Sequence, residues 1–112
     1  MALSLIDPHE ILKAVTGSYS NTTISTVNDQ VVRMSVMQKA YPWHRHPNSD
    51  ELFIGVQGVL VIEFERHLVE LTAGQLLLVP RNVLHRTFPK GDQSVNLTIE
   101  SKDMQTEFDE RD

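Results

Sequence analysis

Apolar and polar residues alternate with a period of two along most of the chain. In the clearest case, Val32, Met34 and Val36 alternate with Arg33 and Ser35, which is the pattern of a half-buried β-strand. The other segments that read as strands are 22–27, 52–57, 59–64, 68–71, 75–79, 85–88 and 94–99. Turn-forming residues separate them at 28–29, 58, 66–67, 73–74, 80–82 and 89–92. Many short strands with turn signals roughly every 8–12 residues predict an all-β sandwich or barrel.

One helix is predicted near the N-terminus, and it ends near Gly17. Asp7 offers a capping side chain, Pro8 suits the first helical position, and Glu10 lies three residues after the cap. The apolar stripe that follows consists of Ile11, Leu12 and Val15. The chain is therefore expected to combine a short N-terminal helix with an all-β body.

Composition narrows the class of protein. The chain has 112 residues, of which 40% are hydrophobic and 22% charged, so one globular domain over residues 1–112 is expected, with its barrel core at about 30–100. The absence of cysteine excludes disulfides, iron–sulfur clusters, thiolate zinc sites and a thiol nucleophile. A net charge of −5 argues against a nucleic-acid partner.

The sequence also predicts where the protein resides and how its end behaves. The longest aliphatic run spans only residues 76–79, and no basic region precedes an apolar run at the N-terminus, so neither a membrane span nor a secretory signal is expected. We therefore predict a cytoplasmic protein. From Glu100 to the end there are six acidic and two basic residues, and the segment 101–112 is expected to be a frayed, dispensable tail.

The segment around residues 43–51 carries the chemistry. On an extended backbone residues two apart face the same side, so His44 and His46 aim their rings into one space. Glu51 opens an apolar strand, where a buried carboxylate needs a positive partner. A divalent metal shared with the two imidazoles would supply it, and His85 is available as a third imidazole. Three imidazoles and a carboxylate suit Fe, Mn, Ni, Co, Cu or Zn, and octahedral geometry leaves two positions open.

The spacing of these residues resembles that of the cupin family. His44-x-His46-x4-Glu51-x6-Gly58 is similar to the first cupin motif, and Gly74-x5-Pro80-x-Asn82-x2-His85 resembles the second. Asn82 stands where the family usually has glycine, and asparagine tolerates the left-handed backbone well. The resemblance implies a double-stranded β-helix, or jelly-roll barrel, with His44, His46, Glu51 and His85 around an interior metal. It also implies a homodimer, and the apolar outer face of strand 59–64 gives a reason for one.

Strand parity predicts which other side chains reach the cavity. Phe53 shares the parity of Glu51, and Thr87 shares that of His85, so both are expected to line the pocket. Met34 is placed there too, together with Val36. The residues expected to stay away from the metal are His9, Trp43, Arg45, Asp50, His67 and Arg86. Arg81, in the loop at Pro80, is the arginine with a route to the barrel mouth, and Tyr41 is the nearest candidate general base.

Three functions fit these features. A metal with open positions in a barrel suits an enzyme that acts on a small molecule, either a dioxygenase or an isomerase or lyase. A non-catalytic module that holds a metal and a small ligand fits equally, because no general base is evident beside the ligands. A structural dimer with a vestigial site is the third possibility. The substrate and the metal are open on the sequence alone.

Overall fold

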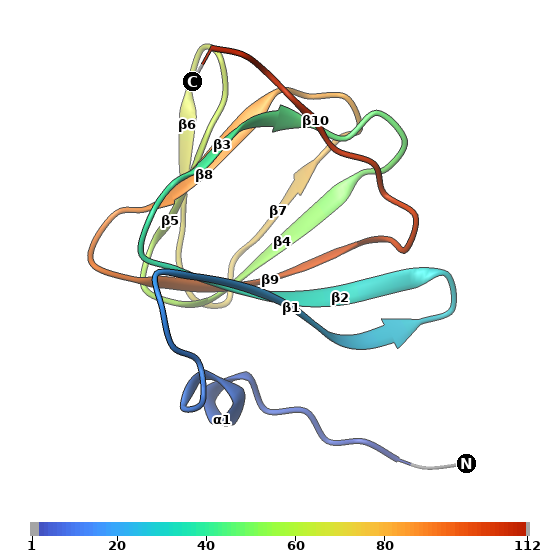
Figure 1. Cartoon of the computed structure of the whole chain (residues 1–112), viewed down its shortest axis with the longest axis vertical. Helices are drawn as coiled ribbons and strands as arrows, with labels where there is room; N and C mark the ends of the chain where they lie inside the picture. The colour runs from blue at the N-terminus through green and yellow to red at the C-terminus, as the bar shows by residue number, and fades with distance from the viewer. Residues whose placement is uncertain (1–2, 112) are drawn as a thin grey trace.

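The structure, a computed structural model, describes residues 3–111 and is almost entirely β-structure (Figure 1). One short helix precedes ten strands. In chain order the elements are α1 (Pro8–Leu12), β1 (Tyr19–Val27), β2 (Gln30–Met37), β3 (Tyr41–Arg45), β4 (Glu51–Gln57), β5 (Leu60–Glu63), β6 (Leu68–Leu71), β7 (Leu76–Val79), β8 (His85–Pro89), β9 (Ser94–Ser101) and β10 (Glu107–Phe108). The predicted all-β class with one N-terminal helix is confirmed.

The strands form two five-stranded antiparallel sheets that face each other (Figure 1). Sheet A has the order β1-β2-β9-β4-β7, and sheet B has the order β10-β3-β8-β5-β6. Strands far apart in sequence are neighbours, as in the pairing of β2 with β9 and of β3 with β8. This double-sheet arrangement is the jelly roll, and it encloses a space between the two sheets.

The helix begins as predicted and ends early. Asp7 caps it by accepting a hydrogen bond from the amide of His9, and Pro8 occupies the first helical position. The regular helix stops at Leu12, and turn hydrogen bonds continue the chain to Val15. Its apolar side packs on the outer face of sheet A, against a buried cluster of Met34, Val36 and Val95.

In sheet A, the strands β9 and β2 carry mainly polar residues on the inner face and apolar residues on the outer face. Along β9 the side chains of Ser94, Asn96, Thr98 and Glu100 are all buried inside, whereas Leu97 lies on the outer side. The neighbouring strand β2 follows the same rule, with Arg33, Ser35 and Met37 on the cavity side. The expectation that Met34 and Val36 line the pocket is therefore wrong. Both pack under the helix, because the apolar stripe of β2 is covered from outside.

The apolar core between the sheets lies at one end of the barrel. Its buried members are Met37, Phe53, Leu60, Ile62, Leu71 and Val79. Val61 of β5 is also only 4% exposed, so this strand has no exposed apolar face, and the reason given above for dimerisation through it does not hold. Two exposed apolar side chains lie next to each other on one face of β7, where Leu76 is 60% and Leu78 54% exposed.

The C-terminal segment is ordered against the barrel, which corrects the expectation of a frayed tail. The chain leaves β9 and crosses to sheet B, where β10 pairs with β3 (Figure 1). In that pairing Phe108 lies opposite His44, and the amide of Asp109 donates to the carbonyl of Trp43. Within residues 3–111 there is no helix long and apolar enough to cross a membrane.

Candidate metal centre

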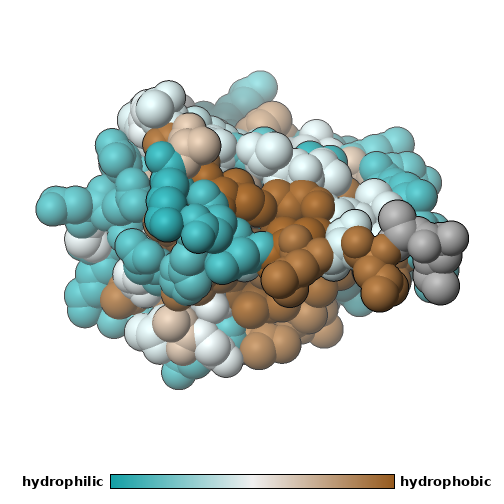
Figure 2. Space-filling model, turned by 90° about the horizontal axis from the view of Figure 1, so that it is seen from below, coloured by the Kyte–Doolittle hydropathy of each residue, from teal (hydrophilic) through white to brown (hydrophobic). Residues whose placement is uncertain are grey.

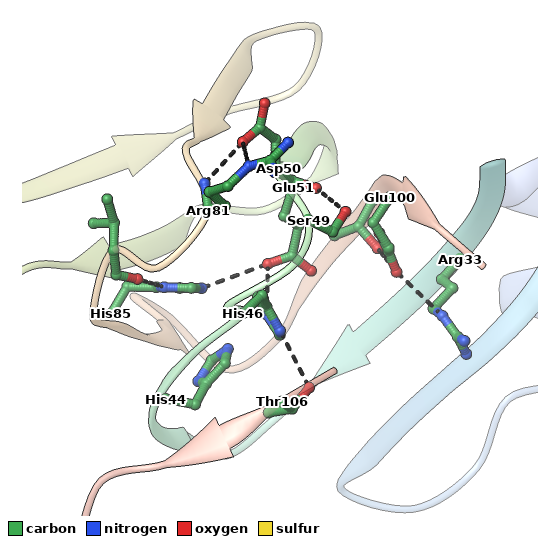
Figure 3. Close-up of polar contacts among 12 residues, drawn as sticks. Arg33, His44, His46, Ser49, Asp50, Glu51, Arg81, His85, Glu100 and Thr106 are labelled. Carbon is green, nitrogen blue, oxygen red and sulfur yellow. Dashed lines mark hydrogen bonds and ion pairs between the residues drawn. The ribbon is translucent and has the colours of Figure 1, made fainter. Parts of the chain in front are cut away.

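Four buried side chains from both sheets converge inside the barrel (Figure 3). His44 on β3 and His85 on β8 lie directly opposite each other in sheet B. His46 follows β3, and Glu51 begins β4 in sheet A. Asn82 has a φ of 67°, the left-handed conformation expected for it, and its amide donates to the carbonyl of His46 over 2.8 Å. The turn before β8 is thereby tied to the segment that carries the first two histidines.

Each of the three imidazoles is held by a main-chain carbonyl. The Nδ1 atom of His44 lies 2.7 Å from the carbonyl oxygen of Pro42, and that of His85 lies 2.8 Å from the carbonyl oxygen of Val83. The Nδ1 atom of His46 lies 3.0 Å from the carbonyl oxygen of Gln105. Because a carbonyl oxygen only accepts hydrogen bonds, the proton of each neutral ring sits on Nδ1. All three Nε2 atoms then present a lone pair.

These lone pairs face one another and a carboxylate. One ligand atom from each of His44, His46, Glu51 and His85 lies within 4.8 Å of all the others. The Nε2 atoms of His46 and His85 are 3.2 and 3.5 Å from the Glu51 Oε1 atom. None of these three atoms has a hydrogen-bond partner. Buried acceptors that point at each other are costly unless a cation or a proton lies between them.

The donor set fits a divalent transition metal. Metal–nitrogen bonds of about 2.0–2.1 Å place opposite ligands of an octahedron roughly 4.2 Å apart, close to the span of the cluster. Imidazole and carboxylate donors together suit first-row transition metals better than Ca²⁺ or Mg²⁺. The main-chain carbonyls behind the rings are the usual outer partners of metal-bound histidines. The cluster is therefore able to hold such an ion with little rearrangement.

The electrostatics of the cluster point in the same direction. Burial and the neighbouring His85 lower the pKa of His44 to about 4, so this ring is neutral at physiological pH. Burial lowers the pKa of His46, but the adjacent Glu51 carboxylate, which favours the protonated ring, outweighs burial and raises the pKa overall. Burial favours the neutral form of Glu51, whereas the imidazoles of His46 and His85 beside it favour the carboxylate and hold its pKa at about 2. Glu51 is thus a permanent negative charge facing the imidazoles.

Three of the four residues, His44, His46 and Glu51, line a cavity of about 390 Å³, while His85 is fully buried behind them. Phe53 and Thr87 line it, on the side that strand parity predicts. Tyr41 also lines it, and its ring stands edge-on to His44 with the centroids 4.9 Å apart. Met104 and Thr106 of the C-terminal segment close part of its wall. The cavity is large enough for a small organic molecule beside the cluster.

The sheet A wall of this cavity is polar, and the sequence analysis missed it. Its lining residues include Arg33, Ser35, Asn96, Thr98 and Glu100. The Arg33 Nε atom pairs with the Glu100 Oε1 atom at 3.1 Å, while the Glu100 Oε2 and Asn96 Oδ1 atoms have no partner. Burial and the charge of Glu51 raise the pKa of Glu100 to about 7. The strict polar–apolar alternation over residues 94–100 was a signal for this wall, but it does not say which face is inside.

Other predicted residues lie outside the cavity. Trp43 is buried on the outer side of β3, with the guanidinium groups of Arg86 and Arg111 at 5.5 and 4.9 Å from its ring centroid. Arg81 turns to Asp50, which accepts a hydrogen bond from its amide over 2.8 Å, so Arg81 is not the arginine of the cavity. That place belongs to Arg33. The remaining three, His9, Arg45 and His67, are absent from both the cavity and the cluster.

Comparison with known proteins identifies the family to which this barrel belongs. Residues 26–99 match the cupin domain family. The chain belongs to this family. This cupin is 41% identical over 97 residues to the uncharacterized protein YdbB of Bacillus subtilis, a match that covers 86% of the chain and 85% of YdbB.

Solved structures give the same result for the fold. A protein from Shewanella frigidimarina that contains a cupin-2 domain superposes with a TM-score of 0.82 at 26% identity, covering 88% of this chain and 95% of that one. A double-stranded β-helix protein from Klebsiella pneumoniae superposes with a TM-score of 0.80 at 14% identity, covering 98% and 100%. The fold is therefore the cupin double-stranded β-helix.

Proposed function

We propose that this cupin is a metal-dependent protein that binds or transforms a small molecule inside its barrel. The observation that carries the proposal is the convergence of three buried imidazoles on the Glu51 carboxylate, where the Nε2 atoms of His46 and His85 and the Oε1 atom of Glu51 have no hydrogen-bond partner. His44, His46, Glu51 and His85 would hold the ion. When bound, such a metal polarises oxygen atoms of a ligand, and a redox-active metal also supplies electron transfer.

The cavity supports a small polar ligand. The polar wall of sheet A lines the same cavity as the histidine and glutamate side chains of the candidate metal centre. It offers two hydrogen-bond acceptors without a partner, the Asn96 Oδ1 and Glu100 Oε2 atoms. A matching ligand would have oxygen atoms that coordinate the metal at one end. At its other end it would have hydroxyl groups that donate hydrogen bonds to the acceptors of sheet A. A cytoplasmic location and the lack of a nucleic-acid partner stay predictions of the sequence.

An enzyme has more support than a binding module. The objection from the sequence was the lack of an acid or base apart from the metal ligands. Glu100 answers it, because this side chain is 1% exposed, lines the cavity and has a pKa of about 7. A group that titrates near physiological pH is suited to proton transfer. A metal-dependent oxygenase and a metal-dependent isomerase or lyase are both consistent with this arrangement.

The test is elemental analysis of protein purified without added metal. We expect one transition-metal ion per chain. Iron would favour oxygenase chemistry, whereas zinc or nickel would favour chemistry without electron transfer. A protein that takes up no divalent metal even after reconstitution would overturn the proposal in favour of a vestigial site.

The proposal includes a homodimer formed through the outer face of sheet A. Leu76 and Leu78 are exposed there and lie opposite Ile54 and Leu52 in the β4–β7 pairing. Figure 2 shows apolar residues gathered on this side of the molecule. A continuous apolar surface of this kind is typical of a subunit interface.

Light scattering tests the dimer. We expect twice the 12.7 kDa mass of the chain at micromolar concentration. Leu78→Lys should shift the protein towards monomer, because a charge would enter the interface. Leu68→Lys is the matched control, since Leu68 is 53% exposed on sheet B. A wild-type mass of one chain, or equal effects of the two variants, would contradict this interface.

A further inference from the structure

One of the three imidazoles depends on the far end of the chain. His44 and His85 each contact the carbonyl of a residue two positions earlier in the sequence. His46 has no such local partner for its Nδ1 atom. Its partners are the carbonyl oxygen of Gln105 at 3.0 Å and the hydroxyl oxygen of Thr106 at 3.1 Å, both about sixty residues away. Figure 3 shows Thr106 approaching the ring from the side opposite Glu51.

The segment that provides these partners, residues 103–109, is here called the strap. Two side-chain hydrogen bonds from Asn48 hold its first part. The Asn48 amide nitrogen donates to the carbonyl of Asp103 over 3.0 Å, and its amide oxygen accepts from the backbone amide of Gln105 over 2.8 Å. Asn48 lies in the short loop between His46 and Glu51, so the loop that carries two cluster residues also clamps the strap.

The second part of the strap is fixed to sheet B. β10 pairs with β3, with Glu107 opposite Arg45 and Phe108 opposite His44. The amide of Asp109 donates to the carbonyl of Trp43 over 2.9 Å. The strap is therefore fixed both before and after its Gln105 carbonyl, and this keeps the carbonyl oxygen next to the Nδ1 atom of His46. The acidic side chains of this segment gave no indication of this role in the sequence, because the strap contacts the histidine and the loop largely through its backbone.

We propose that the strap is a built-in part of the metal centre, in which the Gln105 carbonyl positions His46 with its Nε2 lone pair towards the other ligands. Without that carbonyl the His46 ring is free to turn and to carry its proton on either nitrogen. A neutral imidazole binds a metal through the nitrogen that lacks the proton, so loss of the strap weakens the site although every ligand is still present. This inference rests on the proposed metal site.

The experiment compares wild type with three variants. Deletion of residues 105–112 removes the carbonyl, and Asn48→Ala releases the strap without changing a ligand. Gln105→Ala is the matched control, because it keeps the backbone carbonyl and removes only an exposed side chain. Affinity for Zn²⁺ is measured by competition with a chelator. In the metal-free proteins, ¹⁵N NMR of the histidine rings reports which nitrogen carries the proton.

We expect the deletion and Asn48→Ala to lower Zn²⁺ affinity by about 10- to 100-fold, the usual effect of losing an outer partner of a ligand. His46 alone should change to a mixture of tautomers, while Gln105→Ala stays within about two-fold of wild type in affinity. Should the deletion fail to fold, Asn48→Ala decides. Wild-type affinity in a folded variant, or weaker affinity with an unchanged His46 tautomer, would overturn the role of the strap. If wild type binds no Zn²⁺, the proposed function fails, and the tautomer measurement still tests the strap.

Discussion

Sheet B and sheet A line the same cavity with different chemistry. The sheet B side presents His44 and His85, each with its proton held by a nearby carbonyl, so both rings are oriented before any ion arrives. The sheet A side presents Glu100 and Asn96 with acceptor atoms that have no partner. The sheet B wall orients imidazole nitrogens that can bind a cation. The sheet A wall has polar atoms that only a ligand or water can satisfy. The difference indicates that the proposed metal site is preorganised by the fold, whereas the unpartnered acceptors of the sheet A side lower the stability of the protein.

The strongest way to break this comparison is to remove an imidazole from sheet B. His44→Ala and His85→Ala should each abolish tight metal binding, with a loss of more than about 100-fold in affinity, because three ligands close the coordination sphere poorly. Metal content after dialysis against a chelator at pH 7.5 measures this. His67→Ala is the control, since His67 stacks on Phe64 outside the cluster. Wild-type metal content in His44→Ala or His85→Ala would show that the imidazoles of sheet B do not bind the metal.

The second prediction concerns pH and has an intermediate effect. A histidine binds a metal only as the neutral imidazole, which carries one ring proton and not two. Metal affinity should therefore fall as the pH is lowered through the ordinary imidazole pKa of about 6.5. His44, with a pKa of about 4, stays neutral over this range, whereas the raised pKa of His46 makes it the site where protons compete first. Metal-linked stability is therefore present at pH 8 and lost towards pH 5. Melting temperatures with and without Zn²⁺ across this range measure it, and a constant difference down to pH 5 would contradict the site.

The smallest expected effect belongs to the sheet A wall. The folded-state pKa of Glu100 is about 7, above the ordinary value of 4.5. Between these two pH values the folded protein binds more protons than the unfolded chain, so stability falls as the pH rises through this window. Glu100→Gln removes the buried charge and should raise the stability of the metal-free protein at pH 8 by on the order of 1 kcal/mol, or a few degrees in Tm.

Thermal melts at pH 8 and pH 4 provide the measurement for Glu100→Gln. At pH 4 the carboxyl is protonated in the folded protein, so the variant should gain little there. Glu70→Gln is the control, because Glu70 is a solvent-exposed partner of Lys90. A destabilised Glu100→Gln at pH 8 would mean that the ion pair with Arg33 outweighs the cost of burial, and the two walls would then be equally well satisfied.

Local sequence determined the elements and the residues of the candidate metal cluster. The capping residues at Asp7 and Pro8 set the start of the helix, and turn residues such as Asn82 adopt the backbone that their side chains allow. Strand parity over a few residues predicts that His44 and His46 share one face, and the spacing of Glu51 and His85 within motifs that resemble those of the cupins completes the cluster. Each of these inferences depends on neighbours along the chain.

Only the tertiary structure decided which face of a strand is inside and where the chain end goes. Alternation in β2 and β9 divides residues between two faces, but burial of the apolar face under a helix is as favourable as burial inside the barrel. Met34 therefore lies outside and Glu100 inside. The strap has the same physical basis: a backbone carbonyl belongs to every residue, so no side-chain pattern marks Gln105 as the partner of His46.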